Sequence, residues 1–179
     1  MIVLGLDPSL RNFAIVKGDL NIDTNEFNPT FAELVETSTT KTKRVRKNSD
    51  DLERARSISA ALRNYTDEAT IIFAEIPVGS QSSRAMASYG ISIGIISALA
   101  RPLIQVTPSE VKIAATGDKN ATKDEMIQWA YAMYPDLNWL KRGGKLLAKN
   151  EHIADSIAAI HAGLESEQFL SARAIFQTL

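Results

Sequence analysis

The chain has 179 residues, a length typical of one domain, and its 20 basic and 21 acidic residues give a formal net charge of −1. This near-neutral balance lacks the strong basic excess that indicates nucleic-acid binding from composition alone. The absence of cysteine excludes disulfides and thiolate metal sites. The N-terminal MIVLGLDPSL has no basic segment before its short apolar run, so we expect neither a signal peptide nor a membrane anchor.

Three strands are expected near the N-terminus. Residues 2–6 (IVLGL) are an apolar run that stops at Asp7, which indicates a buried strand. Residues 12–16 (NFAIV) predict a second strand, joined to the first as a hairpin. A third strand is expected around residues 31–35.

A basic insertion at about residues 36–50 separates these strands from the first expected helix. Its TKTKRVRK run contains Lys43 and Arg44, and we interpret it either as a loop that grips DNA phosphates or as a solvated loop. A helix is predicted over residues 51–65. The apolar face of this helix is expected to contain Leu52, Ala55, Ile58 and Leu62.

The second half of the chain alternates strands with helices. Residues 69–76 (ATIIFAEI) and 102–106 (PLIQV) are apolar runs typical of buried strands. The small residues between them predict a tightly packed helix over residues 86–99, which is also a candidate dimer face. Further helices are expected to begin at TPSEVK and to cover residues 122–134 and 151–164, with a loop over residues 135–150 that contains the basic LKRGGK. This order favours an α/β fold, in which a mixed central sheet has helices on both faces.

Three carboxylates occupy positions that otherwise look buried. Asp7 and Glu75 each stand at the end of an apolar strand, and Asp155 lies on a helix with apolar neighbours. An ionised carboxyl group is seldom buried without a compensating cation or hydrogen-bond donor. His152 lies one helical turn before Asp155 and so shares its helix face.

Each position also has a purely structural interpretation. Asp7 is compatible with a turn residue, Glu75 with an arginine pair, Asp155 with an ion pair to Lys149, and His152 with a hydrogen bond at the helix start. If the three carboxylates instead converge, divalent cations must offset their repulsion, and Mg²⁺ or Mn²⁺ suits such oxygen ligands. Paired ions among carboxylates support in-line hydrolysis of phosphodiester bonds.

Four segments resemble, in the same order along the chain, the RuvC-type Holliday junction resolvases, which are crossover junction endodeoxyribonucleases. MIVLGLDPSLRNFAIV is similar to their first hairpin, and IIFAEIPVGSQSSRAMASYG is similar to the strand that ends in the second acidic residue. VTPSEVKIAATGDKNATKDEM resembles the segment in which a glycine precedes a lysine that opens a helix, and NEHIADSIAAIHAG resembles the C-terminal helix with the last acidic pair. Residues 19–50 and 135–149 lie outside the resemblance.

The resemblance implies one nuclease domain over residues 1–179 with a ribonuclease H-like fold. It also implies a homodimer that acts on branched DNA, in particular four-way junctions, with two Mg²⁺ or Mn²⁺ ions per active site. A cytoplasmic location follows, in a bacterium or in the host cell if a bacteriophage encodes the protein. The catalytic and metal-binding residues would be Asp7, Glu75, His152 and Asp155.

Basic residues are the candidates for substrate binding. Lys112 and Lys123 fall where the family has basic residues near its substrate, although both positions are also compatible with solvated helix lysines. The insertion adds Lys43 and Arg44 as candidate DNA-binding residues.

Departures from the family pattern keep other functions open. His152 stands where many members have aspartate, Ser9 stands where glycine is usual, and Val78 is a weak substitute for the aromatic residue that some relatives have after the second acidic residue. These differences indicate a divergent member. They leave room for a related nuclease that acts on forks, flaps or RNA, or for an inactive junction-binding module. An ATPase half of the sugar-kinase or actin type is disfavoured, because the sequence has no second glycine-rich phosphate-binding hairpin.

Overall fold

The structure is a computed structural model that describes residues 1–39 and 46–176, so Lys43 and Arg44 lie outside the described residues. Within these ranges the strands are β1 (Ile2–Asp7), β2 (Asn12–Leu20), β3 (Phe27–Glu36), β4 (Ile71–Glu75) and β5 (Leu103–Val106). They form one mixed sheet in the order β3-β2-β1-β4-β5. The β1–β2 and β2–β3 pairs are antiparallel, whereas the β1–β4 and β4–β5 pairs are parallel.

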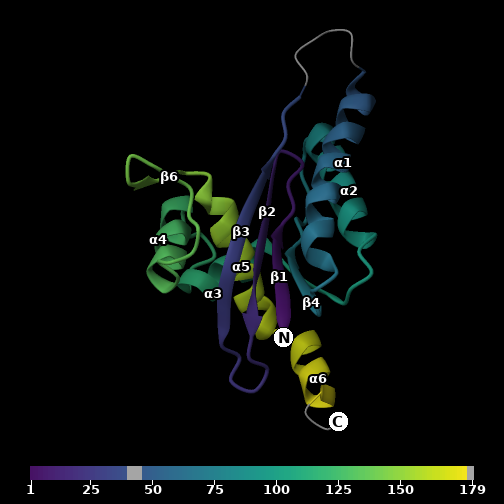
Figure 1. Cartoon of the computed structure of the whole chain (residues 1–179). Coiled ribbons are helices and arrows are strands. Elements are labelled where there is room, and N and C mark those ends of the chain that lie inside the picture. Colours follow the sequence, from purple (N-terminus) through teal and green to yellow (C-terminus); the bar gives the residue numbers. More distant parts are fainter. Residues whose placement is uncertain (40–45, 177–179) are drawn as a thin grey trace.

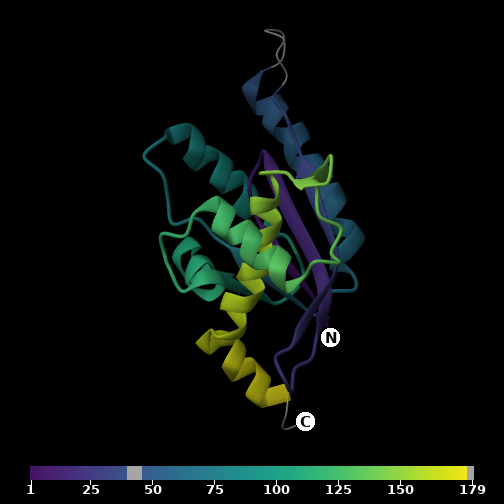
Figure 2. The ribbon, with the colours of Figure 1, turned by 90° about the vertical axis from the view of Figure 1, so that its left-hand side faces the viewer.

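Helices cover both faces of this sheet, as the order of the elements predicts (Figures 1 and 2). They are α1 (Lys47–Thr66), α2 (Ser83–Ser97), α3 (Pro108–Thr116), α4 (Lys123–Met133), α5 (Asn150–Leu164) and α6 (Glu167–Phe176). α1 and α2 lie on one face, and α3, α4 and α5 lie on the other (Figure 1). In the described part of the chain, no helix is long and apolar enough to span a membrane. The mixed sheet with helices on both faces confirms the α/β class expected from the sequence.

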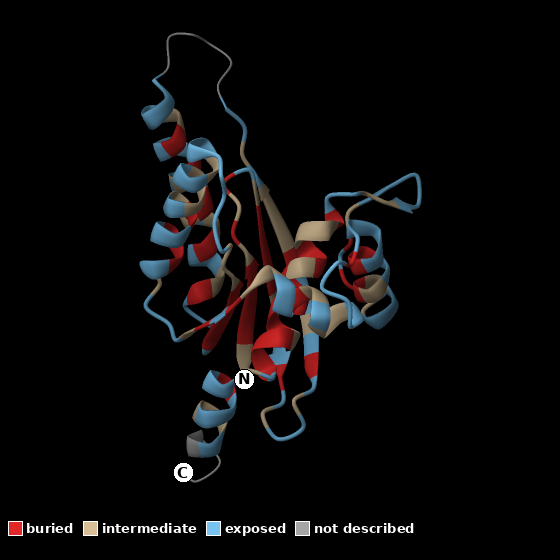
Figure 3. Cartoon of the chain, turned by 180° about the vertical axis from the view of Figure 1, so that it is seen from behind, coloured by how far each residue is buried: buried red, intermediate tan, exposed pale blue. Residues whose placement is uncertain are grey.

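The alternation of side chains along the central strands decides which residues face α5. Leu6 of β1 packs toward α1 and α2, whereas Val3 belongs to the core that contains most of α5. Asp7 shares the face of Val3, because successive side chains on a strand point to opposite faces. On β4, Phe73 lies in the same core as Val3, so Glu75 also faces α5. Figure 3 shows that buried residues are concentrated in these strands and in α5.

The apolar face expected for α1 is partly wrong. Leu52 is 51% exposed, whereas Asp51 and Arg54 are buried beside it. Arg84 of α2 donates two hydrogen bonds to the Asp51 carboxylate, each 2.6 Å long, and Arg54 lies 3.4 Å from the same carboxylate. An ionic cluster thus replaces apolar packing at the start of α1, and the apolar contact with this core begins at the partly buried Ala55 and continues through Ile58 and Leu62.

α2 is less tightly packed within the chain than its small residues suggest. Gly90 and Gly94 are exposed, and a Cβ atom added at either position would meet nothing within 4 Å. Met86 and Ile93 are also exposed on this helix. The expectation of close packing around these glycines is therefore wrong for the single chain, and small and apolar residues lie together on the outward side of α2.

The loop expected over residues 135–150 contains a short hairpin. β6 (Lys141–Arg142) pairs antiparallel with β7 (Lys145–Leu146). Gly143 and Gly144 form the turn with φ angles of 57° and 77°, a region that glycine adopts without strain. Strands of this length are too short to produce a periodic pattern, so the sequence alone predicts a loop.

Gly5 marks the closest approach of α5 to the sheet. A Cβ atom at Gly5 would lie 2.2 Å from the carbonyl oxygen of Ser156 and 2.9 Å from side-chain carbons of Ile160. Because backbone atoms cannot move aside cheaply, we expect Gly5→Ala to displace α5 and to lower the free energy of unfolding by about 2–3 kcal/mol. Chemical denaturation measures this change.

Gly94→Ala is the matched control. The added methyl group meets open space, and alanine favours a helix over glycine, so the free energy of unfolding should rise by up to about 1 kcal/mol. Both variants are compared at a protein concentration at which the chain is monomeric. Equal effects of the two substitutions would contradict the role assigned to Gly5.

Candidate active site

The carboxyl ends of β1 and β4 bring two carboxylates together. Asp7 is the last residue of β1 and Glu75 is the last residue of β4, and the parallel register pairs Leu6 with Ala74 just before them. Neighbouring strands lie about 4.8 Å apart, and both side chains point to the α5 face of the sheet. The two carboxylates are therefore neighbours at this end of the sheet.

α5 brings a histidine and a third carboxylate to the same place. His152 Nδ1 lies 2.6 Å from Asp7 Oδ2. Asp155 lies close enough to Asp7 and Glu75 for both charges to act on its pKa. The structure thus brings together, from β1, β4 and α5, all four residues that the sequence analysis selected.

A hollow of about 260 Å³ opens at this point. Its lining residues are Asp7, Lys112, Ala121, Lys123, Met126, Glu151, His152 and Asp155. Glu75 does not line the hollow, but it interacts with Asp7 and with Lys112. Both lysines selected as substrate-binding candidates, Lys112 and Lys123, therefore lie beside the acidic residues.

Burial and mutual repulsion act on two carboxyl groups of the site. Burial raises the pKa of Asp155 to about 8, and the charges of Asp7 and Glu75 add to this effect. Burial also raises the pKa of Glu75 to about 7, with a further increase from Asp7 and an opposing influence of Lys112. The site therefore favours the uptake of protons or cations at neutral pH.

The His152 imidazole is held at both ring nitrogens. Nδ1 faces Asp7, and the side-chain amide nitrogen of Asn12 lies 3.1 Å from Nε2. Burial lowers the pKa of His152, but the hydrogen bond to Asp7 and the nearby negative charges outweigh this, so the pKa is raised overall. Asp7 favours the tautomer with the proton on Nδ1, in which the Nε2 lone pair accepts a hydrogen bond from the Asn12 amide. A proton or a metal ion at Nε2 would displace this hydrogen bond.

Two neighbours of His152 were missed by the sequence analysis. Asn12 opens β2 on the same face as Ala14, so the alternation along β2 could have indicated it. Glu151 Oε2 lies 2.6 Å from Lys123 Nζ, and Glu151 Oε1 lies 3.5 Å from His152 Nε2. No sequence pattern indicates this ion pair, which joins the start of α4 to the start of α5.

Two side chains hold the turn between β1 and β2. Ser9 Oγ accepts hydrogen bonds from the backbone N–H groups of Arg11 and Asn12, both at 3.3 Å. The buried Arg54 donates to the carbonyl oxygen of Leu10 at 3.1 Å. Ser9 therefore contributes hydrogen bonds that close the turn.

The ion pairs considered as alternatives for two carboxylates do not form. Lys149 pairs with Glu36 and not with Asp155. The cation beside Glu75 is Lys112, and across residues 1–39 and 46–176 no arginine forms a salt bridge with Glu75. The convergence of the carboxylates is thus left without a simple structural explanation.

The chemical types of the donor atoms, carboxylate oxygens and an imidazole nitrogen, suit a divalent metal ion. Carboxylate oxygens suit Mg²⁺ and Mn²⁺, and imidazole suits Mn²⁺ better than Mg²⁺. A cation at this point would offset the burial and the repulsion that raise the pKa of Asp155 and Glu75. As the described residues stand, no group of three or more histidine, aspartate or glutamate side chains is arranged closely enough to hold a metal ion.

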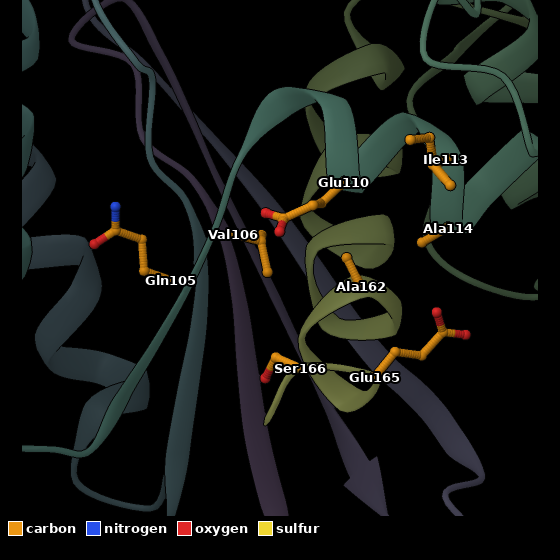
Figure 4. A pocket seen from close by; sticks show the side chains of 8 residues that line it. All are labelled: Gln105, Val106, Glu110, Ile113, Ala114, Ala162, Glu165 and Ser166. Carbon is orange, nitrogen blue, oxygen red and sulfur yellow. The ribbon is translucent and has the colours of Figure 1, made fainter. Parts of the chain in front are cut away.

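A second hollow, of about 240 Å³, lies between β5, α3 and the end of α5 (Figure 4). It contains two carboxylates, those of Glu110 and Glu165. Glu110 accepts hydrogen bonds from the backbone N–H and the hydroxyl of Thr107, at 2.7 and 2.8 Å, and so completes the cap of α3. With no histidine or lysine in its lining, this hollow lacks the acid–base groups found around Asp7.

Comparison with protein-family models and with curated protein sequences finds no match. Among solved structures, the chain is similar to Thermus thermophilus RuvC in complex with a Holliday junction substrate, with a TM-score of 0.67 and 19% identity over 97% of this chain and 96% of that chain. It is similar to the yeast mitochondrial Holliday junction resolvase, with a TM-score of 0.58 and 13% identity over 99% and 86% of the two chains. It also resembles the fowlpox virus resolvase in complex with substrate Holliday junction DNA, with a TM-score of 0.51 and 15% identity over 98% and 99%. This likeness shows the fold, which is the ribonuclease H-like fold expected from the sequence.

The metal-free protein should lose stability as the pH rises from about 5 to about 8. The folded-state pKa values, about 7 for Glu75 and about 8 for Asp155, lie above the ordinary values of 4.5 and 3.8. The folded chain therefore keeps protons that the unfolded chain releases, so the free energy of unfolding falls until both groups ionise. Asp155→Asn should remove much of this dependence and stabilise the protein at about pH 8 by an amount on the order of a few kcal/mol.

Thermal unfolding in the presence of a chelator, from about pH 5 to about pH 9, measures this effect. Asp136→Asn, at an exposed carboxylate outside the site, is the control and should keep the pH dependence of the parent. The same dependence in Asp155→Asn would show that Asp155 ionises freely in the folded chain.

Proposed function

We propose that the protein is a divalent-metal-dependent endonuclease that resolves four-way DNA junctions by paired phosphodiester hydrolysis. The observation that carries the proposal is the shared position of Asp7, Glu75 and Asp155, where burial and then mutual repulsion raise the pKa of Glu75 and Asp155. The substrate class is supported by the similar fold of resolvases solved with junction DNA.

The acidic residues and His152 would hold one or two Mg²⁺ or Mn²⁺ ions. When bound, such ions supply charge stabilisation for the attacking and leaving oxygens of phosphodiester hydrolysis. His152 Nε2 would serve as a ligand or would accept the proton that the attacking water releases. Asp7 would stabilise the imidazolium form through Nδ1. Asn12 orients the neutral ring through Nε2, and its amide would have to turn and present its oxygen once Nε2 is protonated.

Lys112 and Lys123 would bind phosphate oxygens beside the acidic residues. Lys112 acts on Glu75 from α3, and Lys123 pairs with Glu151 at the start of α5. The Lys123 side chain is 79% exposed, so its ion pair contributes little to stability and can exchange for a DNA phosphate at low cost.

We further propose that two copies pair through the outward side of α2. Gly90 and Gly94 allow a second backbone to approach closely, and Met86 and Ile93 supply exposed apolar surface. A pair related by a two-fold axis would present two active sites, which matches paired incisions in a junction with its own two-fold symmetry.

A broader specificity for forks or flaps is the second candidate. In the loop after Glu75, Val78 is 84% exposed and offers less surface for stacking on bases than an aromatic residue would. Weak contact at the junction centre would favour a nuclease that accepts several branched structures.

Asp7→Asn should reduce junction cleavage by a factor on the order of 10³ or more, because it removes the carboxylate that contacts His152 and lies next to Glu75 and Asp155. Binding of the junction should persist. The measurement compares incision of a four-way junction, a Y-shaped fork and an RNA–DNA hybrid in Mg²⁺ and in Mn²⁺. Asp136→Asn is the control for loss of a carboxylate outside the site.

Normal junction cleavage by Asp7→Asn would refute the proposed mechanism. Equal cleavage of fork and junction by the parent protein would favour the broader specificity, and preferential cleavage of the hybrid would point to an RNA substrate. Binding without incision in either metal would indicate an inactive junction-binding module.

Ile93→Asp should convert a dimer into a monomer, because it buries a charge in the proposed contact. Sedimentation velocity measures the molecular mass in solution. Ile113→Asp on α3 is the matched control, since Ile93 and Ile113 are 41% and 50% exposed. A dimer that survives Ile93→Asp, or one lost equally in Ile113→Asp, would show that α2 does not form the contact.

A further inference from the structure

The β6–β7 hairpin (residues 141–146) is a basic projection that the proposed active site does not use. Lys141, Arg142 and Lys145 are all exposed on its two strands. Arg142 and Lys145 form no salt bridge with any carboxylate in the described residues, and Lys141 lies over the Tyr131 ring with 4.9 Å between Nζ and the ring centroid. The hairpin therefore presents positive charge to its surroundings.

The hairpin has a fixed shape. Lys141 pairs with Leu146 and Arg142 with Lys145 across the two strands. The Gly143–Gly144 turn has the positive φ angles of a tight hairpin turn, whose twist matches that of the strands. Below the paired residues, the Leu147 N–H donates to the Leu140 carbonyl oxygen at 3.0 Å and extends the ladder.

A buried asparagine fastens the base of the hairpin to α5. Asn150 is fully buried, and its side-chain oxygen accepts from the Leu140 N–H at 3.0 Å. Its amide group donates to the carbonyl oxygens of Leu140 and Leu147, at 2.8 and 2.9 Å. Asn150 is the first residue of α5, in the same helical turn as His152. The orientation of the hairpin is thus tied to the helix that carries half of the site.

The position of the hairpin relative to the sheet favours a contact with DNA bound at the proposed active site. Figures 1 and 3 show it standing out from the body beside α4, on the opposite side of the sheet from α1. It lies toward the end of the sheet at which β1 finishes in Asp7 (Figure 1). A long polyanion that enters the site past Lys123 would therefore run toward the hairpin.

We propose that the β6–β7 hairpin is a DNA-binding arm that contacts the phosphate backbone of one duplex arm of the substrate. This inference rests on the proposed function and adds a contact outside the acidic site. Backbone phosphates are the matching partner, because the hairpin offers positive charge with little surface for reading bases. A rigid arm loses less conformational entropy on binding than a flexible lysine-rich loop.

The test uses the Asp7→Asn protein, which should bind DNA without cutting it. Arg142→Ala and Lys145→Ala are combined in this parent, and affinity for a four-way junction and for a linear duplex is measured by fluorescence anisotropy over a series of salt concentrations. Loss of two phosphate contacts should lower the slope of log affinity against log salt by about 2, and should weaken binding at about 0.1 M salt by about tenfold or more. Both DNAs should be affected, since phosphate contacts are independent of sequence and branching.

Arg142→Ala alone is matched with Arg63→Ala, which removes an exposed arginine from the last turn of α1. Only Arg142→Ala should change the salt slope, and an unchanged melting temperature will show that both variants are folded. An unaltered slope in the double variant, an equal change in Arg63→Ala, or a loss confined to the junction would overturn the inference. If the Asp7→Asn parent bound no DNA, both the proposed function and the proposed role of the hairpin would be wrong. If the parent binds DNA, the hairpin variants test the role of the hairpin alone.

Discussion

The contact between the backbones of α5 and β1 is the constraint on which the candidate site depends. Gly5 allows the carbonyl oxygen of Ser156 to approach the strand where any side chain would collide. This approach sets the first turns of α5 over the end of β1, where His152 meets Asp7 and the partly buried Asp155 lies beside them. The separations of the acidic groups are thus fixed by main-chain packing and not by loops, as a site for several charges requires.

The same packing holds carboxylates where their ionised forms are unfavourable, so the site lowers the stability of the folded chain when no cation is bound. Burial next to Asp7 disfavours the ionised forms of Glu75 and Asp155. Lys112 opposes this only in part, and Lys123 shares its charge with Glu151. A divalent ion that binds the folded chain and not the unfolded chain would therefore contribute to stability as well as to chemistry. Folding and metal binding are expected to be linked in this protein.

The sequence predicted those parts of the site that depend on short-range patterns. Asp7 and Glu75 were found because apolar strands end at both residues, and a two-residue alternation gives their common face. Asn12 was missed because the alternation along β2 gives only its face of the sheet, and its contact with His152 of α5 joins residues 140 positions apart. Leu52 was placed in the core because helical periodicity uses only the residues of α1 itself. It gives no sign of Arg84 on α2, whose ion pair with Asp51 takes the place of apolar packing at the start of α1. The hairpin was missed because its two-residue strands span no more than one period of the strand alternation.

Arg54 has a consequence for how the chain can vary. Its guanidinium group binds the Leu10 carbonyl oxygen, and it also donates to Thr37 Oγ1 at 2.8 Å, just beyond the end of β3. Arg54 thus ties the residue that follows β3 to α1, the next element along the chain. Lengthening a connection whose two ends are already secured adds little closure entropy. A change of length between Thr37 and α1 would therefore leave in place the contacts that hold the turn after Asp7.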